Sequence, residues 1–403
     1  MHTRTNRLRL PLVVTTLLAL LMVIGCESAE PVLEAAPGLE ASDIQPGAIA
    51  VTPLGSLSGE KLASPEVFAF RGVHYGQSTA GANRFRPPVP VAPWKGAKPA
   101  TEFGDVCPQS GEVGRRTSAG ELLDYSEDCL VLNIWTPELA VGDRPVMVWL
   151  HGRGFYAGAG SERLYDGARL AARGDVVVVT INHRLNVFGY LQLDEIGGEA
   201  FANSGNAGVQ DMELALRWLK KNVSAFGGNP DNITIFGESG GGVKVATLFG
   251  VPSAKGLFQR GIVQSGARPT GIPLSTAAKN TREVMSKLGV ASIEALQQMP
   301  AEELLKAVTV TNGVRTSPDF GPVVDGSYLP RDMFVPNSSP SAVGVPMMIG
   351  DNRDEYALYE GANPNYGKMT EEQLEARLKP RFGERYDAIV AAYSESRQTN
   401  DPW

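Results

Sequence analysis

Short apolar runs alternate with amphipathic segments along most of the chain. Five runs are rich in β-branched residues and are typical of strands buried on both faces, namely residues 129–135, 145–150, 176–181, 233–236 and 261–264. Between two of these runs, apolar side chains recur at steps of three or four residues, which predicts a long amphipathic helix through Val209, Met212, Leu216, Leu219, Val223 and Phe226. This alternation of strand and helix predicts an α/β fold with a largely parallel sheet.

The two ends of the pattern differ from its middle. Residues 49–71 alternate around Gly55 and Gly59, which predicts antiparallel hairpins at one edge of the sheet. After residue 274 the pattern is mainly helical, with helices expected at 276–288, 293–299, 371–378 and 385–394. One more strand-like run occupies residues 345–350.

The N-terminal segment is typical of an export signal. Arg4, Arg7 and Arg9 precede an apolar stretch, residues 10–25, that is too short for a membrane span. Its end, Val23-Ile24-Gly25-Cys26, resembles a bacterial lipobox, in which cleavage exposes a cysteine that receives lipid; an ordinary cleaved signal peptide is the alternative. We expect a signal peptide at 1–25, a flexible tether at 26–48 and a folded domain at 49–403. The expected location is the bacterial cell envelope, with a secreted protein as the alternative.

Composition restricts the classes of partner. The chain has 403 residues, of which 43% are hydrophobic and 20% charged, enough to bury a large core. Without residues 1–25 it carries 34 basic and 44 acidic residues, and this net charge of −10 disfavours nucleic acids and anionic substrates. No metal-ligand spacing and no cofactor-binding loop is evident, so neither a metal nor a cofactor is expected.

Cysteine usage fits export. If Cys26 carries lipid, Cys107 and Cys129 remain as an even pair. An oxidising compartment could join them, and two buried free thiols are the alternative.

The stretch 233–246, ITIFGESGGGVKVA, combines a strand, a Gly-x-Ser-x-Gly turn and the start of a helix. This arrangement predicts a nucleophile elbow, in which Gly237 and Gly241 allow a close crossing and Ser239 is exposed at the strand end. The amide of Gly240 would then face a developing oxyanion. A phosphate-binding glycine loop shares this context, but only Lys244 follows, without the serine or threonine that the phosphate-binding motif needs.

The stretch 206–242, NAGVQDMELALRWLKKNVSAFGGNPDNITIFGESGGG, resembles the signature of the type-B carboxylesterase and cholinesterase family within the α/β hydrolases. Further family motifs follow one another in order: FRGVHYGQ at Phe70, NRFRPP at Asn83, SEDCLVLNIWTP at Ser126, VWLHGRGFYAG at Val148, INHRLNVFGYL at Ile181, IVQSGA at Ile262 and IGDNRDE at Ile349. The likeness covers roughly residues 49–360. It implies the α/β hydrolase fold, with antiparallel N-terminal edge hairpins and helices on both faces of a mostly parallel sheet. The implied activity is hydrolysis of carboxylic esters through an acyl-enzyme.

The resemblance assigns roles to individual residues. Ser239 matches the nucleophile, and Glu355 matches the triad acid, which without the motif would read as a solvated loop carboxylate. Gly154 and Gly240 match oxyanion-hole donors. Arg153 stands where the family usually has glycine. Its amide would be a further donor, but a left-handed conformation at this residue would cost about 1–2 kcal/mol, so a less well formed hole or a different loop is the alternative. The remaining matches are Glu238 and Ser265 beside the site, and the family disulfide at Cys107 and Cys129.

The third member of the triad is absent from this sequence. In this class of hydrolase the chain order is serine, acid, histidine, yet the four histidines, at positions 2, 74, 151 and 183, all precede Glu355. His74, His151 and His183 fall in motifs where packing roles are expected. We expect the catalytic histidine beyond residue 403, in a reading frame that continues. A naturally short chain with crippled deacylation is the alternative.

Two other functions remain open. The same fold hosts catalytically silent cell-surface binding proteins, although these generally lack the elbow serine that Ser239 provides. A lipase would share the chemistry and differ in its pocket. The expected partner is a small-molecule ester, the expected membrane contact is a lipid on Cys26, and the oligomeric state is left open.

Overall fold

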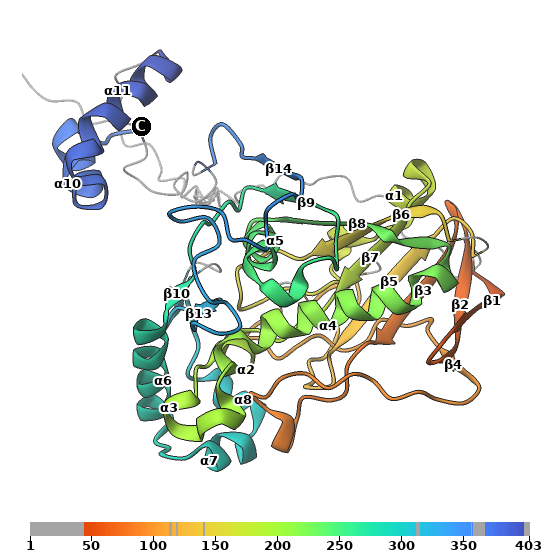
Figure 1. Ribbon diagram of the computed structural model, residues 1–403. Helices are drawn as coiled ribbons and strands as arrows, with labels where there is room; N and C mark the ends of the chain where they lie inside the picture. The colour runs from red at the N-terminus through yellow and green to blue at the C-terminus, as the bar shows by residue number, and fades with distance from the viewer. Residues whose placement is uncertain are drawn as a thin grey trace, which may run out of the picture. The chain divides into compact units, whose positions relative to one another are not determined.

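A central mixed sheet of ten strands organises the computed structural model, which describes residues 44–112, 115–117, 120–139, 142–311, 315–355, 357 and 367–398. Its strand order is β1-β2-β3-β5-β7-β6-β8-β9-β14, with β4 beside β2 (Figure 1). The bounds of its strands are β1 Ile44–Thr52, β2 Gly55–Ala63, β3 Glu66–His74, β4 Ala97–Pro99, β5 Val131–Thr136, β6 Arg144–Leu150, β7 Val177–Ile181, β8 Gly228–Glu238, β9 Arg260–Gln264 and β14 Met347–Gly350.

Strand direction changes at β7. The pairs from β1 to β7 along the order are antiparallel, and those from β7 through β6, β8 and β9 to β14 are parallel. This confirms the predicted fold class and the antiparallel hairpins at the N-terminal edge. The parallel half brings the carboxyl ends of β6, β8, β9 and β14 to one rim, which is where α/β sheets bind ligands.

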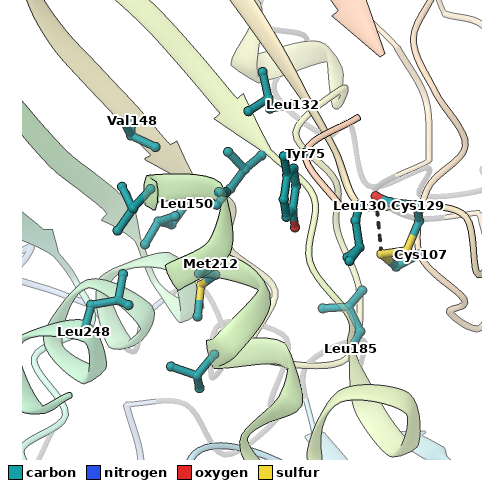
Figure 2. Packing of buried hydrophobic residues seen from close by; sticks show 14 of the residues in the cluster. Tyr75, Cys107, Cys129, Leu130, Leu132, Val148, Leu150, Leu185, Met212 and Leu248 are labelled. Atoms are coloured by element: carbon teal, nitrogen blue, oxygen red, sulfur yellow. Dashed lines mark hydrogen bonds between the residues drawn. A yellow bond between two sulfur atoms is a disulfide. The ribbon is translucent and has the colours of Figure 1, made fainter. Parts of the chain in front are cut away.

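Helices pack on both faces of the sheet, with α1 on one face and α4 and α5 on the other. The bounds of the helices in the described residues are α1 Ala168–Gly174, α2 Asn186–Tyr190, α3 Asp194–Gly197, α4 Ala207–Asn222, α5 Gly240–Gly250, α6 Leu274–Leu288, α7 Ile293–Gln298, α8 Ala301–Leu305, α10 Glu371–Phe382 and α11 Tyr386–Arg397. Successive side chains of β5 point to opposite faces of the sheet. Trp135 packs with Ala168 of α1, whereas Ile134 belongs to the larger core cluster that contains Met212 of α4. In Figure 2, Val148 and Leu150 of β6 lie in the same packed cluster as Met212 of α4 and Leu248 of α5.

The structure differs from the pattern at a few boundaries. The helix predicted to run through Phe226 ends at Asn222, and Val223–Phe226 forms a 3₁₀ turn that closes on Gly227 at φ 76°. Helices α1, α2, α3 and α8 were not predicted. Five short strands were not predicted either, namely β4 and, outside the central sheet, β10 Ile272–Pro273, β11 Thr309–Thr311, β12 Arg315–Ser317 and β13 Val323–Val324. Strands of two or three residues carry too little periodicity to be recognised from sequence.

Among the described residues, strand β14 forms the outer edge of the parallel half. It pairs only with β9 among the described residues, in a register that aligns Gly350 with Gln264. Met348 is 67% exposed and Ile349 is 56% exposed. The strand is therefore held from one side, whereas β8 is held between β6 and β9.

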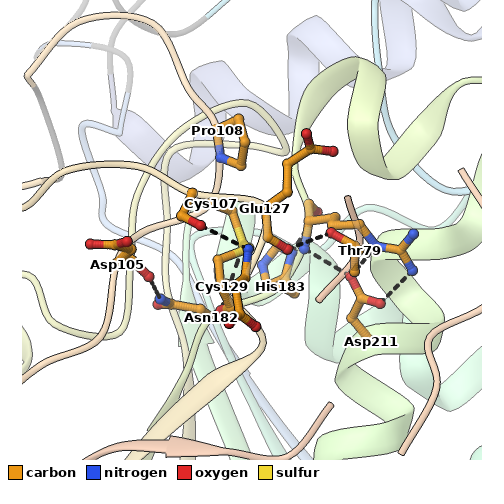
Figure 3. The surroundings of a disulfide bond; sticks show 12 residues. Thr79, Asp105, Cys107, Pro108, Glu127, Cys129, Asn182, His183 and Asp211 are labelled. Atoms are coloured by element: carbon orange, nitrogen blue, oxygen red, sulfur yellow. Dashed lines mark hydrogen bonds and ion pairs between the residues drawn. A yellow bond between two sulfur atoms is a disulfide. The ribbon is translucent and has the colours of Figure 1, made fainter. Parts of the chain in front are cut away.

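A disulfide between Cys107 and Cys129 supports the loop that follows β6 (Figure 3). Both cysteines are buried. The Gln109 side-chain amide donates to the Cys107 and Gly158 carbonyls at 3.1 Å, and Gln109 Oε1 accepts from the Gly158 N–H at 2.8 Å. Asn182 likewise donates to the Asp105 carbonyl at 3.2 Å. The disulfide therefore braces a segment that contacts the loop.

Removing this disulfide is expected to destabilise the fold. The two cysteines are 22 residues apart, and closing a loop of that size contributes about 3 kcal/mol in the chain-entropy account. The double variant Cys107→Ala/Cys129→Ala should lower the free energy of unfolding by about this amount. Chemical denaturation with and without reductant provides the check: reductant should destabilise the parent and leave the double variant unchanged. Equal sensitivity of both proteins would contradict the stabilising role.

Residues 1–43 lie outside the described part, so the expected signal peptide and most of the expected tether lie there too. Within the described residues, no helix combines the length and apolarity needed to cross a membrane.

Candidate active site

A strained serine marks the carboxyl end of the central strand β8. Ser239 joins β8 to α5 with φ 55° and ψ −121°, a backbone conformation that non-glycine residues rarely adopt. Its N–H donates to the Gln264 carbonyl at 2.9 Å, and its carbonyl accepts from the Val243 N–H at 3.1 Å. Hydrogen bonds to strand β9 and to helix α5 therefore hold the strained residue in place.

Glycines around Ser239 let helix α5 press directly on the chain that follows β6. A Cβ atom on Gly241 would lie 2.0 Å from the Leu150 carbonyl oxygen, and one on Gly237 would lie 2.7 Å from the same oxygen. A Cβ on Gly240 would lie 2.3 Å from the Gly154 nitrogen. These distances leave no room for any side chain, which is the close crossing that the sequence predicted.

The loop after β6 turns twice through the left-handed region. Arg153 has φ 63° and Gly154 has φ 62°, so the arginine adopts the conformation expected of the family glycine. The Arg153 guanidinium forms an ion pair with the nearly buried Glu162, and its Nε lies 3.1 Å from Glu162 Oε1. This ion pair helps to offset the backbone strain. The loop lies against the N-terminus of α5, because Gly154 is the neighbour that a side chain at Gly240 would strike.

Glu355 is held beside the elbow by the end of β9. Its Oε2 accepts hydrogen bonds from Ser265 Oγ and from the Asn352 N–H, each at 2.9 Å. Ser265 directly follows the Gln264 carbonyl that binds Ser239, and its own N–H donates to the Gly350 carbonyl at 2.8 Å. Strands β8, β9 and β14 thus bring Ser239, Ser265 and Glu355 together.

Glu238 lies next to the elbow serine and has a shifted pKa. Partial removal of the carboxyl from water and the charge of Glu355 raise the pKa of Glu238 above its ordinary value, while the charge of Arg153 lowers it. The site therefore contains two mutually repelling carboxylates and one cation.

The histidines in the described residues have partners other than Ser239 and Glu355. His151 and His183 stack with ring centroids 4.7 Å apart, and both are fully buried. Burial and the charge of Lys244 lower the pKa of each well below its ordinary value. His74 faces Asp128 at the surface, at 3.5 Å. Across the described residues, no histidine hydrogen-bonds to Ser239 or Glu355, and His2 lies outside them.

Two residues near the site were missed at the sequence level. Glu162 forms an ion pair with Arg153, and Lys244 of α5 is fully buried against the loop that follows β6. The sequence offered one signal for Lys244, because it is a lone charge in the apolar segment VKVATLF. The described residues contain no group of histidine, cysteine or acidic side chains that can hold a metal ion.

Comparisons with known proteins identify the family of this chain. The family described as carboxylesterase matches residues 46–395. Para-nitrobenzyl esterase of Bacillus subtilis is 39% identical over 85% of this chain and 70% of its own length, and phenmedipham hydrolase of Pseudarthrobacter oxydans is 36% identical over 88% and 71%. The crystal structure of Geobacillus stearothermophilus carboxylesterase EST55 superposes with a TM-score of 0.75 at 40% identity, covering 86% of this chain and 70% of that one. The chain belongs to the carboxylesterase family.

Proposed function

We propose that this protein is a serine carboxylic-ester hydrolase that acts through an acyl-enzyme on Ser239. One observation carries the proposal: Ser239 is held at positive φ at the end of β8, directly against the loop that contains Arg153 and Gly154. A serine in this setting presents its hydroxyl to a carbonyl carbon, with backbone amides close by. The carboxylesterase family membership supports the same chemistry.

The reaction follows from this arrangement. Ser239 Oγ attacks the ester carbonyl, and the oxygen that gains negative charge is stabilised by the backbone N–H groups of Gly154, Gly240 and Arg153. The N-terminus of α5 adds a favourable dipole. A general base takes the Ser239 proton during the attack and gives it to the leaving oxygen, so the intermediate expels the alcohol and leaves an acyl group on Ser239. Water, losing a proton to the same base, then attacks this acyl group, which releases the carboxylic acid and restores the Ser239 hydroxyl. The net negative charge of the chain favours uncharged esters over anionic ones.

The general base is proposed to be a histidine encoded beyond residue 403. Among the described residues, the histidines are committed to other contacts, and Glu355 is fixed by Ser265 and Asn352 with one carboxylate oxygen free of these bonds. That oxygen can orient an imidazole and stabilise its charged form. Sequencing the coding DNA past the Trp403 codon tests this directly. An open frame with a histidine is the expected result, and an immediate stop codon would contradict it.

The activity is tested with p-nitrophenyl acetate and an active-site label. We expect the product of the complete reading frame, with its proposed histidine, to turn over the ester. A fluorophosphonate should attach to Ser239 of that product, in the peptide that spans β8 and α5, as read by mass spectrometry. Binding of esters with neither turnover nor labelling would instead indicate a catalytically silent binding protein.

We also propose that the mature protein is anchored to a membrane through lipid on Cys26, because Val23-Ile24-Gly25-Cys26 resembles a lipobox. The variant Cys26→Ser is expected to lose all incorporation of radiolabelled or alkyne-tagged fatty acid and to leave the membrane fraction. Cys107→Ser, which alters a disulfide cysteine, is the control and should keep the label. Label that persists in Cys26→Ser would exclude this anchor.

A further inference from the structure

A fully buried lysine lies beneath the oxyanion loop. The Lys244 side chain in α5 has no exposure, and its Nζ donates to the His151 carbonyl at 2.6 Å. The same nitrogen is 3.5 Å from the Gly152 carbonyl oxygen and 5.7 Å from the centre of the Phe155 ring. All three contacts belong to the chain that follows β6, so one amine meets much of that loop.

This position is unfavourable for a lysine on general grounds. Among the described residues, no carboxylate forms an ion pair with Lys244, and burial lowers the pKa of its amine well below the ordinary value. The residue also lies in the second turn of α5, near the end where the helix dipole disfavours a cation. An apolar side chain of similar volume would avoid these costs. What lysine supplies here is a hydrogen-bond donor.

Helix geometry explains why the donor reaches this loop. Residues four apart lie on the same face of a helix, so Lys244 and Gly240 share one face of α5. Gly240 presses on the Gly154 nitrogen, while Lys244 binds the carbonyls at the start of the loop. One face of α5 therefore contacts both ends of the segment from His151 to Gly154.

Peptide planarity links these carbonyls to the amides of the hole. In a trans peptide, the carbonyl of one residue and the N–H of the next point in opposite directions. The Gly152 carbonyl oxygen lies 3.5 Å from Lys244 Nζ and 3.1 Å from His151 Nδ1, both buried groups. The Arg153 N–H therefore points away from these two groups. Gly152 lies next to the elbow, because a Cβ there would sit 3.8 Å from Ser239 Cβ.

We propose that Lys244 is a positioning residue for the oxyanion hole, whose amine holds the His151 and Gly152 carbonyls so that the loop amides face Ser239. The proposal rests on the function proposed above and adds a residue that does not touch the substrate. It predicts that catalysis depends on the hydrogen-bond donor that this side chain supplies and not on the volume that it fills.

The test compares Lys244→Met, which keeps the volume and loses the donor, with Lys244→Gln, which keeps an N–H donor. Hydrogen exchange followed by mass spectrometry reads the loop directly, because the Gly158 and Gly160 N–H groups bond to Gln109 and Asn182. In Lys244→Met we expect exchange about tenfold faster in residues 151–162, with residues 131–136 of β5 unchanged. Lys244→Gln should recover part of the protection.

Kinetics give the second readout. Lys244→Met should lower kcat for p-nitrophenyl acetate by about 10- to 100-fold with little change in KM, and Lys244→Gln should restore part of the loss. Unchanged loop exchange, or equal loosening of the loop and β5, would overturn the proposal. A product of the complete reading frame that neither turns over the ester nor labels at Ser239 would refute the proposed esterase, and with it this role. The exchange data would separately show whether Lys244 holds the loop.

Discussion

Replacing Ser239 with alanine is expected to lower kcat for p-nitrophenyl acetate by about 10⁶-fold in the esterase. The variant loses the oxygen that forms the acyl-enzyme, and the remaining amides can only bind the substrate. The backbone should not change, because alanine meets the same strain at φ 55° and retains the hydrogen bond from its N–H to the Gln264 carbonyl. Steady-state kinetics and the loss of fluorophosphonate labelling are the measurements.

The matched control for this variant is Ser292→Ala. Ser292 caps helix α7 by accepting a hydrogen bond from the Ala295 N–H, so its loss should cost about 1 kcal/mol of stability and leave kcat unaffected. Undiminished hydrolysis by Ser239→Ala would remove Ser239 from the nucleophile role, whatever its backbone geometry.

The substitution Glu355→Gln is expected to reduce kcat by about 10⁴-fold. Glutamine can still accept hydrogen bonds from Ser265 and the Asn352 N–H through its one oxygen, so the loop should keep its shape. It presents an amide where a carboxylate would stabilise the charged imidazole, which removes the electrostatic contribution alone. Measurement of kcat and KM over a range of ester concentrations, together with the melting temperature, distinguishes this effect from a folding defect.

The neighbouring carboxylate supplies the control. Asp354 is 66% exposed at its side chain and pairs with Arg397 at 2.8 Å. Surface ion pairs of this kind contribute little, so Asp354→Asn should change kcat by less than about twofold. If both variants lose activity equally, the triad acid has been assigned to the wrong residue.

The sequence predicted those parts of the site that local pattern determines. Buried strands such as residues 176–181 can be recognised from their runs of β-branched residues. The elbow at Ser239 can be recognised from a strand, two glycines around the serine and a helix that follow one another in the sequence. Glu355 is different, because an acidic loop residue has no distinguishing periodicity and only the family motif selected it. The structure places it beside Ser265 through the pairing of β9 with β14, strands separated by more than 80 residues.

Long-range packing accounts for what the sequence did not reveal. The stack of His151 on His183 arises because β6 and β7 end side by side, with Leu150 opposite Ile181. Pattern reasoning assigns lysine to solvent, so the burial of Lys244 depends on which loop happens to cover that turn of α5. The ion pair of Arg153 with Glu162 likewise depends on a contact between loops.

Strand β14 supports Glu355 from the rim of the sheet, whereas Ser239 stands at its centre. The free energy needed to open a segment differs from one part of a protein to another. An edge strand that pairs with a single neighbour and has exposed side chains is among the segments that open most easily. Warming the described part alone would therefore release β14, and with it Glu355, before it loosens the residues around Ser239. A continuation beyond residue 403 that pairs with β14 would remove this weakness, so a comparison of heat inactivation with global melting reports whether that edge is covered.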